Sequence, residues 1–105
     1  MKDVLIKFQD LKWTNPMPGV RQKQIIINDK KLRLIEFSED FIEPDWCLKG
    51  HIGYVIEGYM TIDFNGTLVK YETGDGIFIQ EGETTKHKAT IKKGEKVLLF
   101  LVENA

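Results

Sequence analysis

The stretch GYMTIDFNGTLVKYE, residues 58–72, predicts a tight antiparallel hairpin. The pair Asn65-Gly66 at its centre is preferred in type I′ turns, in which both central residues adopt positive φ angles. A two-residue turn pairs Phe64 with Thr67, and alternation along the strands then separates an apolar face from a mostly polar face. The apolar face holds Met60, Ile62 and Phe64. This hairpin is therefore expected to cover part of a hydrophobic core with one side only.

Short strand-like segments on both sides of the hairpin continue the same pattern. They are residues 4–8, 24–27, 32–37, 77–79, 85–91 and 96–102. Their β-branched residues and the turn residues between them favour strand over helix, and no segment keeps an apolar helical period for three turns. Residues 15–19 are expected to form an irregular loop, because two prolines remove backbone donors. The result is an all-β chain of about nine short strands, which indicates a sandwich or a barrel.

The composition is that of an ordinary globular protein. The 105 residues are 42% hydrophobic and 30% charged, so one domain spanning residues 1–105 is expected. Lys and Arg number 15 against 16 Asp and Glu, which gives a net charge of -1. No nucleic-acid partner is expected, because binding to phosphates requires an excess of basic residues.

Three features of the sequence bear on the cellular compartment of the protein. Its longest apolar run, residues 97–102, is far shorter than the roughly twenty residues of a transmembrane helix, so no membrane partner is expected. The single cysteine, Cys47, cannot form an internal disulfide and is typical of a reducing compartment. The start of the chain shows no secretory-signal pattern. We therefore expect a cytoplasmic protein.

Alternation in the segment 85–91 gives the first candidate site residue. Its polar face carries Lys86 and Lys88, followed by Lys92. The opposite face holds Thr85, His87, Ala89 and Ile91. Lysines mark the solvent side of a strand, so His87 is expected to point into the interior.

Two glycine-bounded stretches carry a family resemblance. The stretch GYVIEG at residues 53–58 and the stretch GDGIFIQEG at residues 74–82 resemble the two conserved motifs of the cupin superfamily. The resemblance implies a double-stranded β-helix, or jelly-roll, barrel with a ligand or metal site in its mouth. It also implies a homodimer, as does the need of the long first strands for a partner at the sheet edge.

Aligning the cupin metal motif with this chain places other residues at the ligand positions. Counting back from Gly58 puts His51 at the family's carboxylate position, and Asp45 and Cys47 at its paired histidines. Thr85 takes the position of the last histidine, with His87 two residues later on the same face. Gly53, inward and beside His51, either opens space at the site or allows a tight bend in the sheet. The expected pocket residues are thus Asp45, Cys47, His51, Gly53, Thr85 and His87.

Three of these residues form the expected metal core. Cys47, His51 and His87 would supply thiolate and imidazole ligands, with Asp45 or water completing the shell. Such a set suits a divalent transition metal, namely zinc, iron or nickel. The alternative is an altered cupin pocket without metal, in which Cys47 is a small buried side chain. Both interpretations stay open at this point.

Two classes of function also stay open. The first is a barrel that binds a small polar ligand, with or without a metal, and performs no catalysis. The second is a metal-dependent cupin enzyme of the isomerase, dioxygenase or lyase type that acts on a small metabolite. The resemblance does not choose between them, because the same barrel carries many activities.

Overall fold

The computed structural model describes residues 4–105, which form an antiparallel β structure with two short 3₁₀ helices. The helices are η1 (Phe8–Asp10) and η2 (Glu83–Thr85). The strands are β1 (Thr14–Met17), β2 (Val20–Ile27), β3 (Lys30–Ser38), β4 (His51–Phe64), β5 (Thr67–Glu72), β6 (Gly76–Ile79), β7 (Lys88–Thr90) and β8 (Lys96–Asn104). The predicted all-β jelly-roll fold class is confirmed. Within the described residues, no helix has the length and apolar character needed to cross a membrane.

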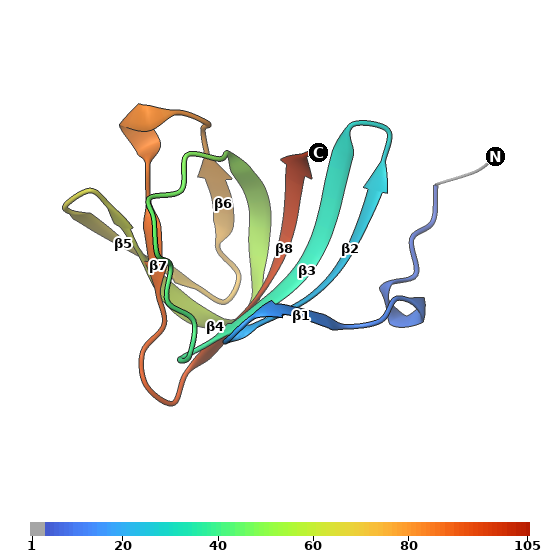
Figure 1. Cartoon of the computed structure of the whole chain (residues 1–105), viewed down its shortest axis with the longest axis horizontal. Helices are drawn as coiled ribbons and strands as arrows, with labels where there is room; N and C mark the ends of the chain where they lie inside the picture. Colours follow the sequence, from blue (N-terminus) through green and yellow to red (C-terminus); the bar gives the residue numbers. More distant parts are fainter. Residues whose placement is uncertain (1–3) are drawn as a thin grey trace.

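The strands form one strongly curled sheet in the order β1-β2-β3-β8-β4-β5, and β4 pairs in addition with β6 and β7. The first half of β4 pairs with β8 and β6, whereas its second half pairs with β5 and β7. In Figure 1, β2, β3 and β8 therefore lie on one side of the interior, and β5 and β7 lie on the other. Strand β4 joins the two sides.

The corner in β4 depends on a bulge and a glycine. The register with β8 shifts between Val55 and Glu57, which marks an extra residue at the bend. Gly58 follows with φ +86°, and a Cβ atom placed on it would lie 2.0 Å from the carbonyl oxygen of Lys96. Only glycine combines this backbone angle with so close an approach of the neighbouring strand.

The hairpin predicted around Asn65-Gly66 is confirmed. Phe64 pairs with Thr67, and the register continues to Tyr59 opposite Glu72. Asn65 and Gly66 have φ angles of 56° and 110°, both positive as a type I′ turn requires. The Asp63 carboxylate accepts a hydrogen bond of 2.7 Å from the Gly66 N–H, which further stabilises the turn.

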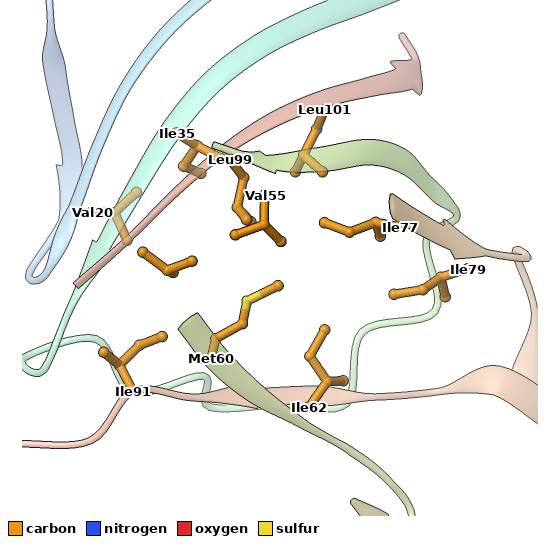
Figure 2. Close-up of a cluster of buried hydrophobic side chains, with 11 residues drawn as sticks. Val20, Ile35, Val55, Met60, Ile62, Ile77, Ile79, Ile91, Leu99 and Leu101 are labelled. Carbon is orange, nitrogen blue, oxygen red and sulfur yellow. The ribbon is translucent and has the colours of Figure 1, made fainter. Parts of the chain in front are cut away.

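Aliphatic side chains from both sides of the barrel form the core, and Figure 2 shows them pointing towards a common interior. The core residues are Val20, Ile35, Val55, Met60, Ile62, Ile77, Ile79, Ile91, Val97, Leu99 and Leu101. Most belong to strands in which every second residue points inward, as the alternation along β8 illustrates. Burial of this apolar surface is the main force that stabilises the barrel.

Two predictions for the N-terminal region are wrong. Residues 4–8 form no strand, and Val4 and Leu5 are 69% and 71% exposed because no neighbouring strand pairs with them. Residues 15–19 are not an irregular loop, since Thr14–Met17 pairs with β2 as β1. Pro16 is accommodated because β1 is an edge strand and has a partner on one side only.

The segment 85–91 is also shorter as a strand than predicted. Thr85 ends the helix η2, and regular pairing begins at Lys88. The described residues contain eight strands, whereas about nine were predicted. The predicted inward face is nevertheless correct for His87 and Ile91, which are 4% and 7% exposed. Ala89 packs against the same core.

The core analysis yields a stability prediction for a pair of isoleucines. Ile35 in β3 is 1% exposed, whereas Ile26 in β2 is 55% exposed. We expect Ile35→Ala to lower the free energy of unfolding by about 2–4 kcal/mol, because it removes buried methyl groups and leaves a void. Ile26→Ala removes the same atoms from an exposed position in a strand. We expect it to change the free energy of unfolding by less than about 1 kcal/mol. Urea unfolding measures both, and similar losses in the two variants would contradict this description of the core.

Candidate functional site

The barrel interior holds a cavity of about 410 Å³. Most of its wall is apolar and comes from the same strands that build the core. Its polar wall residues are Gln22, Arg33, Glu43, Cys47, Lys49, His51 and His87. Both histidines and the only cysteine of the chain therefore face one cavity. The side chains of the barrel that could bind a metal or react therefore lie together on the wall of this cavity.

Backbone pairing positions Cys47 next to His87. The Cys47 N–H donates to the His87 carbonyl oxygen at 2.8 Å, and the His87 N–H donates to the Cys47 carbonyl oxygen at 3.0 Å. This isolated antiparallel bridge attaches the connection between β3 and β4 to the segment that leads into β7. Two residues 40 positions apart in sequence thus become direct neighbours.

His51, the first residue of β4, completes the cluster. Its Nε2 atom lies 3.7 Å from the Cys47 Sγ atom, and its ring centroid is 5.2 Å from that of His87. One ligand atom from each of Cys47, His51 and His87 lies within 4.8 Å of the others. Three side chains from three separate segments therefore converge on a space that one ion could occupy.

The hydrogen bonds of the two imidazole rings determine which nitrogen is available. The His87 Nδ1 atom lies 3.0 Å from the Thr85 carbonyl oxygen, which can only accept, so Nδ1 carries the proton. The His51 Nδ1 atom contacts the carboxylate of Glu103 and likewise donates to it. In both rings Nε2 is therefore the nitrogen left for the cavity. Metal-binding histidines usually have this arrangement, with the other nitrogen held by a carboxylate or a carbonyl.

An ion pair between buried Glu103 and half-buried Arg33 holds His51 on the side of the ring that faces away from the cavity. Glu103, in β8, is only 7% exposed, and its Oε1 atom accepts a hydrogen bond of 3.0 Å from Arg33 Nη1. Arg33 in turn donates to the Gln22 side-chain oxygen from Nε at 3.2 Å and from Nη2 at 2.8 Å. A continuous polar chain thus runs from β2 through β3 and β8 to β4. It satisfies the buried carboxylate and holds the His51 ring in one orientation.

Solved structures with similar folds match nearly the whole chain. The polyketide cyclase RemF from Streptomyces resistomycificus has a TM-score of 0.77 at 22% identity, covering 99% of this chain and 79% of that one. An RmlC-like cupin from Shewanella frigidimarina has a TM-score of 0.75 at 14% identity, covering 98% and 91%. A structure of Fe(II)-HppE with an alternative substrate has a TM-score of 0.73 at 13% identity, covering 97% and 60%. No family model matches the sequence, and no curated protein sequence is similar to it.

The protein has the cupin fold. The fold implied by the two glycine-bounded motifs is thereby confirmed. Identities of this size establish the shared barrel and no shared activity. The chemistry of this barrel must therefore be judged from its own residues.

The six predicted pocket residues divide into two groups in this barrel. Cys47, His51 and His87 line the cavity together. Asp45 is exposed and lies outside the cavity wall, as does Thr85, whose hydroxyl donates to the Gln80 carbonyl oxygen. Gly53 opens no space, because a Cβ atom there would lie 2.0 Å from the Phe100 carbonyl oxygen. Its role is to allow the close approach of β4 and β8.

Glu103 and Arg33 are site residues that the sequence motifs did not reveal. Glu103 lies 52 positions from His51 and 70 positions from Arg33 in the sequence. Motif spacing therefore cannot indicate these contacts. One weak signal existed for Glu103. Alternation along the last strand puts it on the same inward face as Leu99 and Leu101, where a carboxylate requires a partner.

The groups of the cluster shift one another's protonation. Hydrogen bonds from His51 and His87 outweigh burial and lower the pKa of Cys47 to about 6. Burial opposes the charged form of His51, but its hydrogen bonds to Cys47 and Glu103 prevail and raise its pKa to about 9. Burial is likewise overcome at Glu103, where His51 and Arg33 lower the pKa to about 2. Without metal, the resting state at neutral pH is a thiolate–imidazolium pair backed by a carboxylate.

This charge state can be tested on the single thiol. In the metal-free protein, we expect alkylation of Cys47 by iodoacetamide to accelerate through a midpoint near pH 6, because the thiolate is the reactive form. In the His51→Ala variant the midpoint should move up towards the usual thiol value of about 8.5, since the main stabilising hydrogen bond is lost. An unchanged midpoint in the variant would show that His51 does not control the thiol.

Proposed function

We propose that this barrel binds a divalent transition metal through Cys47, His51 and His87, and holds a small organic ligand beside it. The observation that carries the proposal is the convergence of one sulfur and two Nε2 atoms at the wall of a cavity large enough for a metabolite. The Nδ1 contacts of both rings support it, because they orient the rings before any ion arrives.

The donor set fits zinc, iron or nickel. Thiolate with two neutral imidazoles is a common environment for such ions, and three protein ligands leave a position open for water or ligand. Because Asp45 is exposed outside the cavity wall, we assign the open position to water or the organic ligand instead. When bound, such an ion polarises a carbonyl group or activates a water molecule. Glu103 and the Thr85 carbonyl would hold the two imidazole rings in place throughout.

A metal-dependent reaction on a small metabolite is the second candidate function. The feature that favours it is the open position, which would face a cavity and not packed side chains. Two neighbours of similar fold are named for chemistry on small molecules, a polyketide cyclase and Fe(II)-HppE. A non-catalytic binding barrel remains the first candidate, because the described cavity wall offers few groups beyond the cluster that could transfer a proton.

Metal uptake tests the proposed site. Wild-type protein is expected to take up one zinc or nickel ion per chain at neutral pH, and His51→Ala and Cys47→Ser should each abolish stoichiometric uptake. Uptake should weaken as the pH falls from about 9, because the metal competes with the proton of His51, and weaken further below about 6, where the Cys47 thiolate is also protonated. Elemental analysis after metal loading and desalting gives the stoichiometry, and circular dichroism checks that the barrel is folded.

Lys88→Ala is the matched control for the metal experiment. Lys88 lies one residue from His87, but its ammonium group stacks over the Trp46 ring, 5.0 Å from its centroid, and supplies no ligand. This variant should bind metal like the wild type. Absence of metal uptake by the wild type, or full uptake by a folded His51→Ala variant, would contradict the proposed metal site.

We also propose that the protein is a cytoplasmic homodimer that pairs through the outer face of β4 and β6. Ile52 and Phe78 are cross-strand neighbours on this face and are 54% and 70% exposed, and Tyr54 beside them is 50% exposed. Contiguous apolar surface of this kind is typical of protein interfaces. The cytoplasm suits a reactive thiolate such as Cys47, which a reducing compartment keeps free of disulfides.

Light scattering after size exclusion tests the dimer. The wild type is expected at twice the chain mass of 12.2 kDa. Phe78→Lys should give a monomer, because it places a charge in the proposed interface. Leu68→Lys is the control, because it also replaces an exposed apolar side chain, 68% exposed, but lies on β5 outside the proposed interface. It should leave the dimer intact. A wild-type mass of one chain would overturn the proposal.

A further inference from the structure

The polarity of the cavity wall changes along the length of the strands. A layer here means a set of residues that pair across neighbouring strands. The register of β3 with β8 places Arg33 opposite Leu101 and Ile35 opposite Leu99. Glu103 lies one layer beyond Leu101, and His51 pairs with Ile79 at the same end of the barrel. Arg33, Glu103 and His51 therefore lie near the start of β4, and Gln22 reaches Arg33 from the next layer, where it pairs with Ile35. Most of the remaining wall is aliphatic or aromatic and includes Leu99, Met60 and the pair Phe37–Phe41, whose ring centroids are 4.5 Å apart.

Most hydrogen-bond acceptors in the polar layers are already engaged. The Glu103 carboxylate is occupied by Arg33 and His51, and the Gln22 side-chain oxygen accepts twice from Arg33. The Glu43 Oε1 atom accepts from the Ala89 N–H at 2.9 Å. A ligand that mainly donates hydrogen bonds, such as a polyhydroxylated sugar, would find few acceptors here and a mostly apolar wall.

Unused donors remain on the same wall. The Gln22 side-chain NH₂ group is left over once its oxygen faces Arg33, and Arg33 retains N–H groups beyond those used. Lys49 also lines the cavity, and its ammonium group forms no ion pair with any described residue. The charge of Arg33 is paired with Glu103, so the free donors at the polar end are the Gln22 amide, the remaining N–H groups of Arg33 and the exposed ammonium group of Lys49. A ligand should supply acceptors to these groups.

From this complementarity we propose that the organic ligand is an amphipathic acid, with an apolar, ring-sized body among the deep side chains and a carboxylate or similar acceptor group at the polar end. The inference rests on the proposed function, since it concerns the ligand of the same cavity. It narrows the small polar ligand expected from the sequence to one that is polar at one end only. Apolar walls with a few oriented polar groups are typical of sites for such molecules.

Isothermal titration calorimetry with four probes tests the ligand class. Phenylacetate has both required features, 2-phenylethanol lacks the charge, acetate lacks the apolar body, and glucose has neither. We expect phenylacetate to bind at least about tenfold more tightly than each of the others, because it alone uses both ends of the cavity. Equal binding of acetate or 2-phenylethanol, tighter binding of glucose, or no binding of phenylacetate would overturn the inference.

A matched pair of lysine variants localises the binding. Lys49→Met should weaken phenylacetate binding about 3- to 5-fold and leave 2-phenylethanol unchanged, because it removes one partly solvated charge. Lys70→Met, on the exposed surface of β5, should change neither. Identical phenylacetate affinity in the two variants would contradict the assigned role of Lys49.

Running the titrations on metal-free and zinc-loaded protein separates this inference from the proposed function. Preferential binding of phenylacetate to protein that takes up no metal would support the ligand class while the metal site fails. Stoichiometric metal uptake with no preference for phenylacetate would support the metal site and overturn the ligand class.

Discussion

The bend in β4 is the constraint on which both the barrel and its site depend. One strand of 14 residues pairs with β8 and β6 before Gly58 and with β5 and β7 after it, so the two sides of the barrel share a single backbone. Without a residue that accepts a φ of +86° against the Lys96 carbonyl, the chain could not turn there. The same strand starts at His51, so the geometry that closes the barrel also places the central imidazole at its open end.

The buried pair of Glu103 and Arg33 has a specific role in this frame. The free energy of desolvating two charges exceeds their electrostatic attraction unless hydrogen bonds satisfy both groups. Such pairs therefore stabilise proteins only weakly in general. Here the pair connects Gln22 to His51 across four strands, and the carboxylate holds the ring nitrogen that faces away from the cavity. The physical benefit is orientation, since a ring held by its Nδ1 atom presents Nε2 to the thiolate without further reorganisation.

Local signals in the sequence were sufficient for much of this structure. Asn65-Gly66 specified the turn and, with it, the register of six residue pairs, because asparagine and glycine adopt positive φ angles more readily than other residues. Alternation placed His87 inside, and motif spacing brought Cys47 and His51 into the same candidate site. The predictions that were wrong also have physical causes. Residues 4–8 have strand composition but no partner, and Pro16 is tolerated because one side of β1 is free.

Local patterns of residues were thus enough to predict the strand periodicity, the tight turns, the fold class and the three donors that cluster. The further groups that meet these donors follow from the arrangement of the strands in space. Glu103 reaches His51 and Arg33 reaches Glu103 because β3, β8 and β4 lie side by side, although the residues are separated by 52 and 70 positions. The tertiary structure also decided that Asp45 and Thr85 stand apart from the cavity and that Gly53 serves strand packing. Side-chain contacts between strands that are distant in the sequence depend on the order and register of those strands, which a local pattern such as a hairpin turn does not specify.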